Sequence, residues 1–289
     1  MSGTSTGYSS PPSGAPGDGL PPVPETPAQV TEALKALGVR PSRQHGQSFL
    51  IDPFVADAEV ALLDRPSDAS VVEIGGGLGI LTAALLRRGV AELTVIELDP
   101  RLARRLELQF GTSVRIVEGD ALSVPLGTPD AVVGNLPYGA ATAILIRLLK
   151  ARVPRIVVMV QNEVAERLAA RPGPGAYGRL TILAQLFAQV ELFRTVGPPC
   201  FHPRPSVDSR LVALTARPDP LAVRSVPRLE EAVRQLFSSR RKQLGNLLPR
   251  LTPDPDAVAR AAGWPDGWRR RRPEELPPEA FYALANLLT

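Results

Sequence analysis

VVEIGGGLG, residues 71–79, joins a short aliphatic run to four glycines, and the amphipathic segment ILTAALLRRG follows at 80–89. This order predicts a buried strand that turns tightly into a helix. Glycine in such a turn lets the backbone approach a ligand closely, and the N-terminus of the following helix favours a negatively charged group. Gly75 and Gly77 are therefore candidate ligand contacts, although a plain strand-to-helix connection would use the same residues.

Short aliphatic runs and amphipathic segments alternate along the chain beyond this turn. Strands are expected at 71–74, 93–97, 114–120, 131–135 and 155–160, and helices at 80–89, 100–110, 140–150 and 162–170. These strands have the composition of strands buried on both faces. The alternation therefore predicts an α/β fold with a parallel sheet covered by helices on both sides.

The regions on either side of this pattern have a different composition. Residues 1–26 are rich in Gly, Pro, Ser and Thr and predict a disordered tail, because they offer too little apolar surface to bury. A helix is expected to start at Pro27, and two late strands at 188–196 and 208–216 complete a domain over 27–216. Residues 217–289 carry no strand signal, and helical segments at 228–248 and 277–288 predict a small all-helical C-terminal domain.

Composition and charge limit the class of protein. The single cysteine of the 289 residues excludes an internal disulfide and fits a reducing compartment. No apolar run reaches the ~18 residues of a membrane span, and no secretory signal is visible, so we expect a cytoplasmic protein that is not bound to a membrane. The net charge of +4 is concentrated at the C-terminal end, where residues 204–289 hold 15 Arg and Lys against 10 Asp and Glu. This excess favours a polyanionic partner, either nucleic acid or an acidic surface.

The glycine turn distinguishes between two classes of ligand. A dinucleotide-binding G-x-G-x-x-G motif would need glycine where the chain has Ile80, whereas E-x-G-x-G-x-G, led by Glu73, is typical of S-adenosylmethionine-dependent methyltransferases. Glu97 ends the second expected strand, where a carboxylate can accept hydrogen bonds from both ribose hydroxyls. Asp120 ends the third strand and is suited to accept a hydrogen bond from an adenine amino group. Either carboxylate alone would also fit a solvated side chain or a helix cap.

GNLPYGAATA, residues 134–143, follows the fourth expected strand and offers an acceptor site for a nucleobase. The side-chain oxygen of Asn135 and the backbone carbonyl of Leu136 are placed to accept the two hydrogens of an exocyclic amine. Such contacts would hold the amine nitrogen in line with a methyl donor. Pro137 stiffens the turn, and Tyr138 offers a face on which an unstacked base can lie. An ordinary Asn-Pro turn is the alternative.

The joint order of ten motifs resembles the small-subunit ribosomal RNA adenine N6-dimethyltransferases, the KsgA/RsmA/Dim family. The motifs are HGQSFLID, VVEIGGGLGILT, VIELDP, EGDAL, GNLPY, MVQNEVAERL, RPGPGAYGRL, FHPRPSVDS, FSSRRKQLGN and RPEELPPEAFYALANLL. The resemblance implies a Rossmann-like class I methyltransferase sheet with a small helical domain. It also implies S-adenosylmethionine as cofactor and transfer of two methyl groups to N6 of each of two neighbouring adenosines near the RNA's 3′ end, during ribosome biogenesis.

The resemblance also assigns roles to individual residues. The donor contacts carried over are Ser48, Leu50, Gly75, Gly77, Glu97, Asp120 and Asn135, and the catalytic residues are Asn135, Leu136, Pro137, Tyr138 and Phe201. Ser48 stands where the family usually has Asn, so its reach is shorter. NLPYGAATA differs from the commoner NLPYNISTP, and the lost bulk bears on whether one or two methyl groups are added. Phe201 matches the family's aromatic near the target base, and a core aromatic between two strands is the alternative.

The expected partner is the small ribosomal subunit and its RNA, with Arg240, Arg241 and Lys242 on a predicted helix as phosphate contacts and the protein as a monomer. Three alternative functions stay open. They are a large-subunit RNA methyltransferase of the macrolide-resistance type, a mainly non-catalytic small-subunit assembly factor, and a nicotinamide oxidoreductase, which Ile80 disfavours. Cys200 and His202 lie close together without a third orienting group, so neither a thiol nucleophile nor a metal site is expected.

Overall fold

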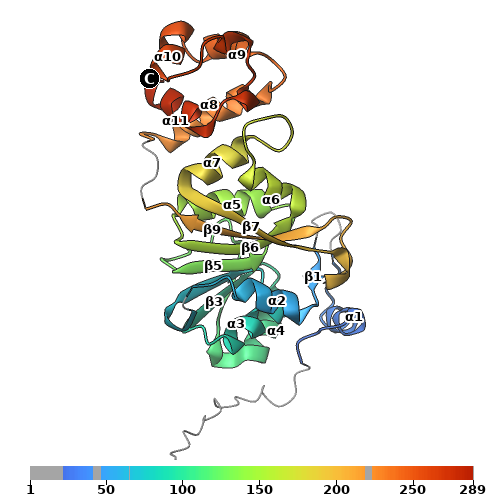
Figure 1. Ribbon diagram of the computed structural model, residues 1–289. Coiled ribbons are helices and arrows are strands. Elements are labelled where there is room, and N and C mark those ends of the chain that lie inside the picture. Colours follow the sequence, from blue (N-terminus) through green and yellow to red (C-terminus); the bar gives the residue numbers. More distant parts are fainter. Residues whose placement is uncertain (1–21, 42–46, 65, 219–222, 289) are drawn as a thin grey trace, which may run out of the picture.

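A seven-stranded sheet with the order β4-β3-β2-β5-β6-β9-β7 forms the centre of the computed structural model, which describes residues 22–41, 47–64, 66–218 and 223–288 (Figure 1). Its strands are β2 (Ser70–Ile74), β3 (Glu92–Glu97), β4 (Arg115–Glu118), β5 (Ala131–Asn135), β6 (Arg155–Gln161), β7 (Ala188–Val196) and β9 (Ser209–Ala216). The five strands from β2 to β6 run parallel, as the alternating pattern predicted. The two late strands instead join antiparallel, β9 beside β6 and β7 at the edge.

The chain reverses its direction of winding between β2 and β5, which lie side by side at the centre of the sheet. Val71, Val72 and Glu73 of β2 pair with 131–133 of β5, while β3 and β4 lie on the other side of β2. Ligands of open α/β sheets bind at the carboxyl ends of the strands where the order reverses. The glycine turn after β2 and the Asn-Leu-Pro-Tyr turn after β5 therefore meet at one edge, as expected.

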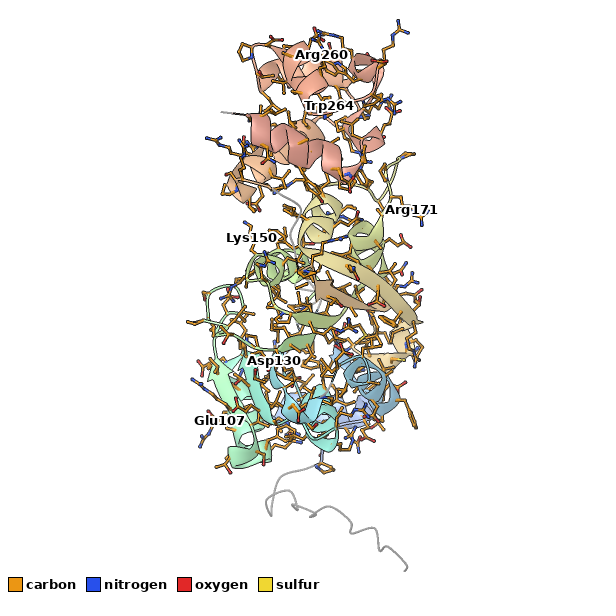
Figure 2. All side chains as sticks on the ribbon, turned by 60° about the vertical axis from the view of Figure 1, so that its left-hand side comes forward. Glu107, Asp130, Lys150, Arg171, Arg260 and Trp264 are labelled. Carbon is orange, nitrogen blue, oxygen red and sulfur yellow. The ribbon has the colours of Figure 1, made fainter. Side chains whose placement is uncertain are left out.

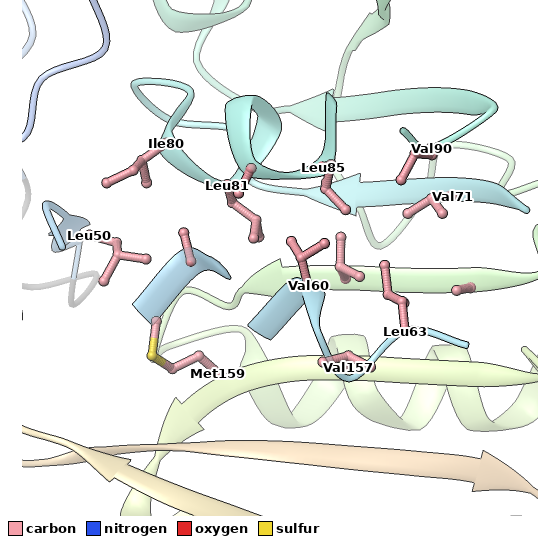
Figure 3. Close-up of a cluster of buried hydrophobic side chains, with 14 of the residues drawn as sticks. Leu50, Val60, Leu63, Val71, Ile80, Leu81, Leu85, Val90, Val157 and Met159 are labelled. Carbon is pink, nitrogen blue, oxygen red and sulfur yellow. The ribbon is translucent and has the colours of Figure 1, made fainter. Parts of the chain in front are cut away.

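Helices cover both faces of this sheet and bury two apolar layers. One layer packs α2 (Pro53–Val60), α3 (Ile80–Arg87) and α4 (Pro100–Phe110) against alternate strand residues such as Val71 and Val157 (Figure 3). The other layer packs α5 (Ala141–Lys150), α6 (Asn162–Ala169) and α7 (Arg179–Phe187) against the intervening strand residues. Side chains alternate between the faces of a strand, so aliphatic runs such as RIVVMVQ serve both layers.

The C-terminal helices stack beyond α7, at the red end of the ribbon in Figure 1. They are α8 (Val226–Ser238), α9 (Leu244–Leu247), α10 (Pro255–Ala261) and α11 (Pro278–Leu287). Figure 2 shows Arg260 and Trp264 on this part and Glu107 at the opposite end of the molecule. The C-terminal helices share one apolar cluster with Tyr177, Ile182, Leu183 and Leu186 from the neighbourhood of α7. The all-helical part is therefore packed firmly on the sheet domain.

The predicted helix at 228–248 is wrong as a single element, because the chain turns at 239–243 between α8 and α9. In a straight helix the residue four positions after buried Leu236 would be Arg240, on the apolar face. The turn keeps Arg240 off the apolar face. Leu244 then begins α9, and its backbone N–H donates to the carbonyl oxygen of Arg271. The segment SSRRKQ therefore lies mostly in a turn.

Other departures concern elements that the sequence pattern did not indicate. Helices α2 and α7 were not predicted, and α7 is buried around most of its circumference, so no polar stripe marks it. Short strands β1 (Phe49–Leu50) and β8 (Phe201–His202) pair antiparallel beside α1 (Pro27–Ala36). The predicted disordered tail falls at 1–21 outside the described residues. Within 22–26, Val23 packs against the core and Pro24 is buried, so these last residues do not belong to a disordered tail.

No helix among the described residues combines the length and apolar character that a membrane crossing requires.

Candidate active site

A cavity of about 680 Å³ opens at the carboxyl ends of the central strands. Most of its lining comes from segments 47–50, 73–78, 96–100, 119–121 and 135–140. It brings together all of the candidate donor contacts, namely Ser48, Leu50, Gly75, Gly77, Glu97, Asp120 and Asn135, and it also includes Leu136, Pro137 and Tyr138. Residues separated by almost ninety positions in the chain thus share one space because their strands are neighbours.

The glycine turn forms one wall of the cavity. Gly75 and Gly77 have φ of +79° and +56°, in the left-handed region that favours glycine. A Cβ at position 77 would also lie 3.2 Å from the ring of Phe49. The backbone N–H of Gly75 donates to the carbonyl oxygen of Ile96 at 2.8 Å, which ties the turn to the end of β3. The wall is therefore bare backbone held at a fixed position.

Glu97 is held at the end of β3 with only 6% of its surface exposed. Its Oε2 accepts from the backbone N–H of Gly77, and its Oε1 accepts from that of Asp99, each at 2.9 Å. Burial raises the pKa of the Glu97 carboxyl, and these backbone donors act in the opposite direction. Each oxygen has a second lone pair, so an oriented carboxylate can still accept from hydroxyl groups in the cavity.

Asp120 lies two residues past β4, in a compact turn beside the end of β3, where the N–H of Gly119 donates to the carbonyl oxygen of Glu97 at 2.8 Å. Its Oδ1 accepts from the backbone N–H of Leu122 at 2.8 Å, and its carbonyl oxygen accepts from Ser123 and Val124. The residue is exposed, unlike Glu97. The turn fixes the direction of the carboxylate without burying it.

The Asn135–Tyr138 turn forms another wall of the cavity. Asn135 ends β5 opposite Met159, and Leu136 continues the ladder by donating its N–H to the Met159 carbonyl oxygen at 3.1 Å. The Pro137 carbonyl accepts from the N–H of Ala141 at 2.9 Å and so starts α5. The Tyr138 phenol hydrogen-bonds the Ser209 hydroxyl at 2.9 Å, and burial raises its pKa. The turn is therefore anchored on both sides.

Four of the five expected catalytic residues line the cavity, and Phe201 does not. It is 1% exposed and packs in the apolar cluster beside α2, opposite Leu50 in the β1–β8 pair. This placement favours the alternative of a core aromatic. Direct contact between Phe201 and a target base would require this packing to open.

The three expected RNA contacts lie in the turn after α8, not on a helix. Arg241 and Lys242 are exposed. Arg240 donates from Nε to the Glu274 carboxylate at 2.8 Å and from Nη1 to the Gly175 carbonyl at 3.1 Å. Glu274, in the 3-10 helix Pro273–Glu275, is 8% exposed. Arg240 thus joins the C-terminal helices to the loop before α7.

Two buried carboxyls near the cavity were not among the expected site residues. Glu73 lines the cavity below the glycine turn, and its Oε2 accepts from the Thr82 hydroxyl at 2.7 Å. Glu59 on α2 is, like Glu73, 0% exposed. Burial, followed by the charge of Glu73, raises the pKa of Glu59 to about 8, and burial raises that of Glu73 to about 8. The sequence pattern that could have identified Glu59 is its spacing. It follows Val55 by four positions, so in a helix it lies on the same apolar side.

Comparisons with known proteins agree with this geometry. The family model described as ribosomal RNA adenine dimethylase matches residues 39–261. A probable ribosomal RNA small subunit methyltransferase A from Natronomonas pharaonis is 42% identical over 264 residues, which cover 87% of this chain and 94% of that protein. The ribosomal RNA small subunit methyltransferase A of Hahella chejuensis is 41% identical over 226 residues, which cover 74% and 82%.

Solved structures show the same fold. A dimethyladenosine transferase from Plasmodium falciparum superposes with a TM-score of 0.68 at 26% identity, over 82% of this chain and 95% of that one. The 23S rRNA methyltransferase ErmE superposes with a TM-score of 0.63 at 28% identity, over 83% and 99%. The expected class I methyltransferase sheet is confirmed, and so is the resemblance carried by the ten motifs. The chain belongs to the ribosomal RNA adenine dimethylase family.

Proposed function

We propose that this chain is an S-adenosylmethionine-dependent ribosomal RNA adenine dimethyltransferase. It transfers methyl groups to N6 of two adjacent adenosines near the 3′ end of small-subunit ribosomal RNA, during ribosome biogenesis. The observation that carries the proposal is the single cavity shared by the glycine turn, Glu97, Asp120 and the Asn135–Tyr138 turn. The relatives at about 40% identity, which are named for the small subunit, support that substrate over the large subunit.

The chemistry of the cavity fits the donor. Bare backbone at Gly75 and Gly77 leaves room for a ligand, and Glu97 offers two oriented oxygens for ribose hydroxyls. Asp120 faces the same space with a carboxylate suited to an adenine amino group. When bound, S-adenosylmethionine supplies a methyl group on a sulfonium sulfur, which needs no metal and no phosphate cradle.

The acceptor side follows from the Asn135–Tyr138 turn. An adenine amine is a weak nucleophile because its lone pair is delocalised into the ring. The Asn135 side-chain oxygen and the Leu136 carbonyl accept its two hydrogens, which orients the nitrogen lone pair towards the methyl group. The Tyr138 ring, restrained by its hydrogen bond to Ser209, provides the surface against which the extruded base lies. No strong base is required, since the nitrogen becomes acidic once it is alkylated.

RNA binding is assigned to the exposed cations of the C-terminal part. Arg241 and Lys242 lie in one exposed turn and are suited to phosphate contacts. Arg240 contributes to the same surface mainly by holding this turn in place through Glu274. The excess of positive charge in residues 204–289 gives the field that attracts the RNA.

The test is label transfer from S-adenosylmethionine to separated ribosomal subunits that lack these methyl groups, followed by mapping of the labelled nucleotides. The proposal expects label on two neighbouring adenosines of the small-subunit RNA. Asn135→Ala should lower the rate on the order of 100-fold, because an oriented acceptor is lost. Calorimetric binding of the donor to the same variant measures the loss that comes from the expected contact of Asn135 with the donor, and this loss should be far smaller than the loss of rate.

The other outcomes assign a different function. Label confined to the large subunit would place the chain with enzymes such as ErmE, whose fold it shares. Tight binding to small subunits without any label would indicate an assembly factor. Label on neither subunit, together with no donor binding, would reject the enzymatic proposal.

A further inference from the structure

Arg147 on α5 reaches across to the turn that carries Asp120. Its Nη1 donates to the carbonyl oxygen of Ala121, and its Nη2 donates to that of Val124. The same turn closes on itself through the Leu122 N–H, which donates to Asp120 Oδ1. One guanidinium therefore holds two carbonyls of the short segment that fixes the direction of the Asp120 carboxylate.

The other end of α5 begins at the acceptor turn. Ala141, its first residue, donates its N–H to the Pro137 carbonyl at 2.9 Å, and Ile144 on the same helix lines the cavity. Arg147 lies three positions after Ile144, on the neighbouring part of the helix surface. Helix α5 is thus fastened to the Asn135–Tyr138 turn at Ala141 and to the Asp120 turn at Arg147, six residues later.

No ladder of the sheet joins the Asp120 turn directly to the Asn135–Tyr138 turn, because β4 and β5 are not neighbouring strands. Asp120 follows β4 at one edge, whereas Asn135 ends β5, and β3 and β2 lie between these strands. A guanidinium is planar and presents several N–H groups in a fixed fork, so it can hold two carbonyls at once. Lysine carries its three donors on one nitrogen at the end of a flexible side chain, so it does not reproduce a planar fork in which two nitrogens each hold one carbonyl.

We propose that Arg147 is a positioning residue that fixes the Asp120 carboxylate for recognition of the donor's adenine amino group and couples this turn to the acceptor turn. The inference rests on the proposed function, in which the cavity binds S-adenosylmethionine. Arg147 acts through the backbone of the Asp120 turn and touches neither the donor nor the target base.

The experiment measures selectivity for the 6-amino group, without RNA. Binding of S-adenosylhomocysteine and of S-inosylhomocysteine, which carries an oxygen in place of that amine, is measured by calorimetry. The wild-type protein should prefer the adenosyl ligand by at least about tenfold, the value of one hydrogen bond. Arg147→Met and Arg147→Lys should lose most of this ratio, while Lys150→Met, on the same helix with an exposed ion pair to Glu230, should keep it.

A second arm separates positioning from general destabilisation. Asp120→Ala should lose the same ratio, and the double variant Asp120→Ala with Arg147→Met should lose no more, because both changes act on one contact. Thermal melting identifies variants that do not fold, and Arg147→Lys keeps the charge if Arg147→Met fails.

An unchanged ratio in the folded Arg147 variants, or additive losses with Asp120→Ala, would overturn the inference. Failure of the wild-type protein to bind either ligand would reject the donor assignment as well, which distinguishes the two failures.

Discussion

Replacement of Glu59 by glutamine will flatten the dependence of stability on pH between pH 5 and pH 8. Glu59 is 0% exposed on the apolar side of α2, where burial raises the pKa of its carboxyl and a hydrogen bond with the backbone of Gly134 opposes this effect only in part. The groups around it are Glu73 from β2, with its Thr82 donor from α3, and the backbone of Gly134 from β5. Glutamine keeps the shape of the side chain and removes its titration.

The magnitude follows from the shift of the pKa of Glu59 from its ordinary value of 4.5 to about 8. The folded protein binds this proton more tightly than the unfolded chain. The stabilisation is therefore complete below pH 4.5 and is lost as the pH rises towards 8. For a single group, this loss amounts to about 3–4 kcal/mol between pH 5 and pH 8. Because Glu73 repels the charged form of Glu59, the two carboxyls titrate as a pair, and their losses do not simply add.

Urea unfolding at pH 5, 6, 7 and 8 gives the free energy of unfolding of the wild-type protein and of Glu59→Gln. The wild-type value should fall with increasing pH, and the difference between the two proteins should shift in favour of Glu59→Gln by several kcal/mol. Asp57→Asn, an exposed position on the same helix, is the matched control and should follow the wild-type profile. Parallel profiles for wild type and Glu59→Gln would refute the reasoning.

Three further predictions concern the backbone, the contact of the C-terminal helices with the rest of the chain, and RNA binding. Gly134→Ala places a Cβ 2.5 Å from the Ile74 carbonyl oxygen, and we expect it to lower the free energy of unfolding in urea by at least about 2 kcal/mol. Arg240→Met leaves the buried Glu274 carboxylate without its guanidinium partner and should lower the free energy of unfolding by about 1–2 kcal/mol. The effect is no larger because Arg240 is 39% exposed, and solvent screens the ion pair. Arg241→Met should keep wild-type stability but reduce the salt slope of RNA binding by about 1. An Arg240→Met variant with unchanged melting and a reduced salt slope would instead make that residue a plain phosphate contact.

The parallel part of the sheet and the meeting of most candidate site residues in one cavity could be predicted because both depend on local patterns. Aliphatic runs mark the ends of these strands to within two residues. Polar residues that follow such strands must meet at one edge of a parallel sheet. Glu97, Asp120 and Asn135 therefore share a cavity although they are distant in sequence.

The remaining features depend on contacts between distant segments, which carry no periodic signal. Arg240, two residues past the end of α8, pairs with Glu274, and no local pattern predicts a partner 34 positions away. The contact of Arg147 with the Ala121 carbonyl is equally invisible, because a cation on a helix is usually solvated. Helix α7 was missed for another reason, since burial around most of its circumference removes the polar stripe by which helices are recognised.

The apolar cluster beneath the C-terminal helices has a consequence for how this chain can be divided. Ile182, Leu183 and Leu186 of α7 belong to the sheet domain by sequence but lie in the same cluster as Leu229 and Phe281. A fragment that ends at residue 216 would expose this apolar side of α7 to water. A fragment of residues 217–289 would lack the apolar surface against which its helices pack. The two parts are therefore not interchangeable modules. Transplanting the helical part onto another methyltransferase would require carrying the matching side of α7 with it.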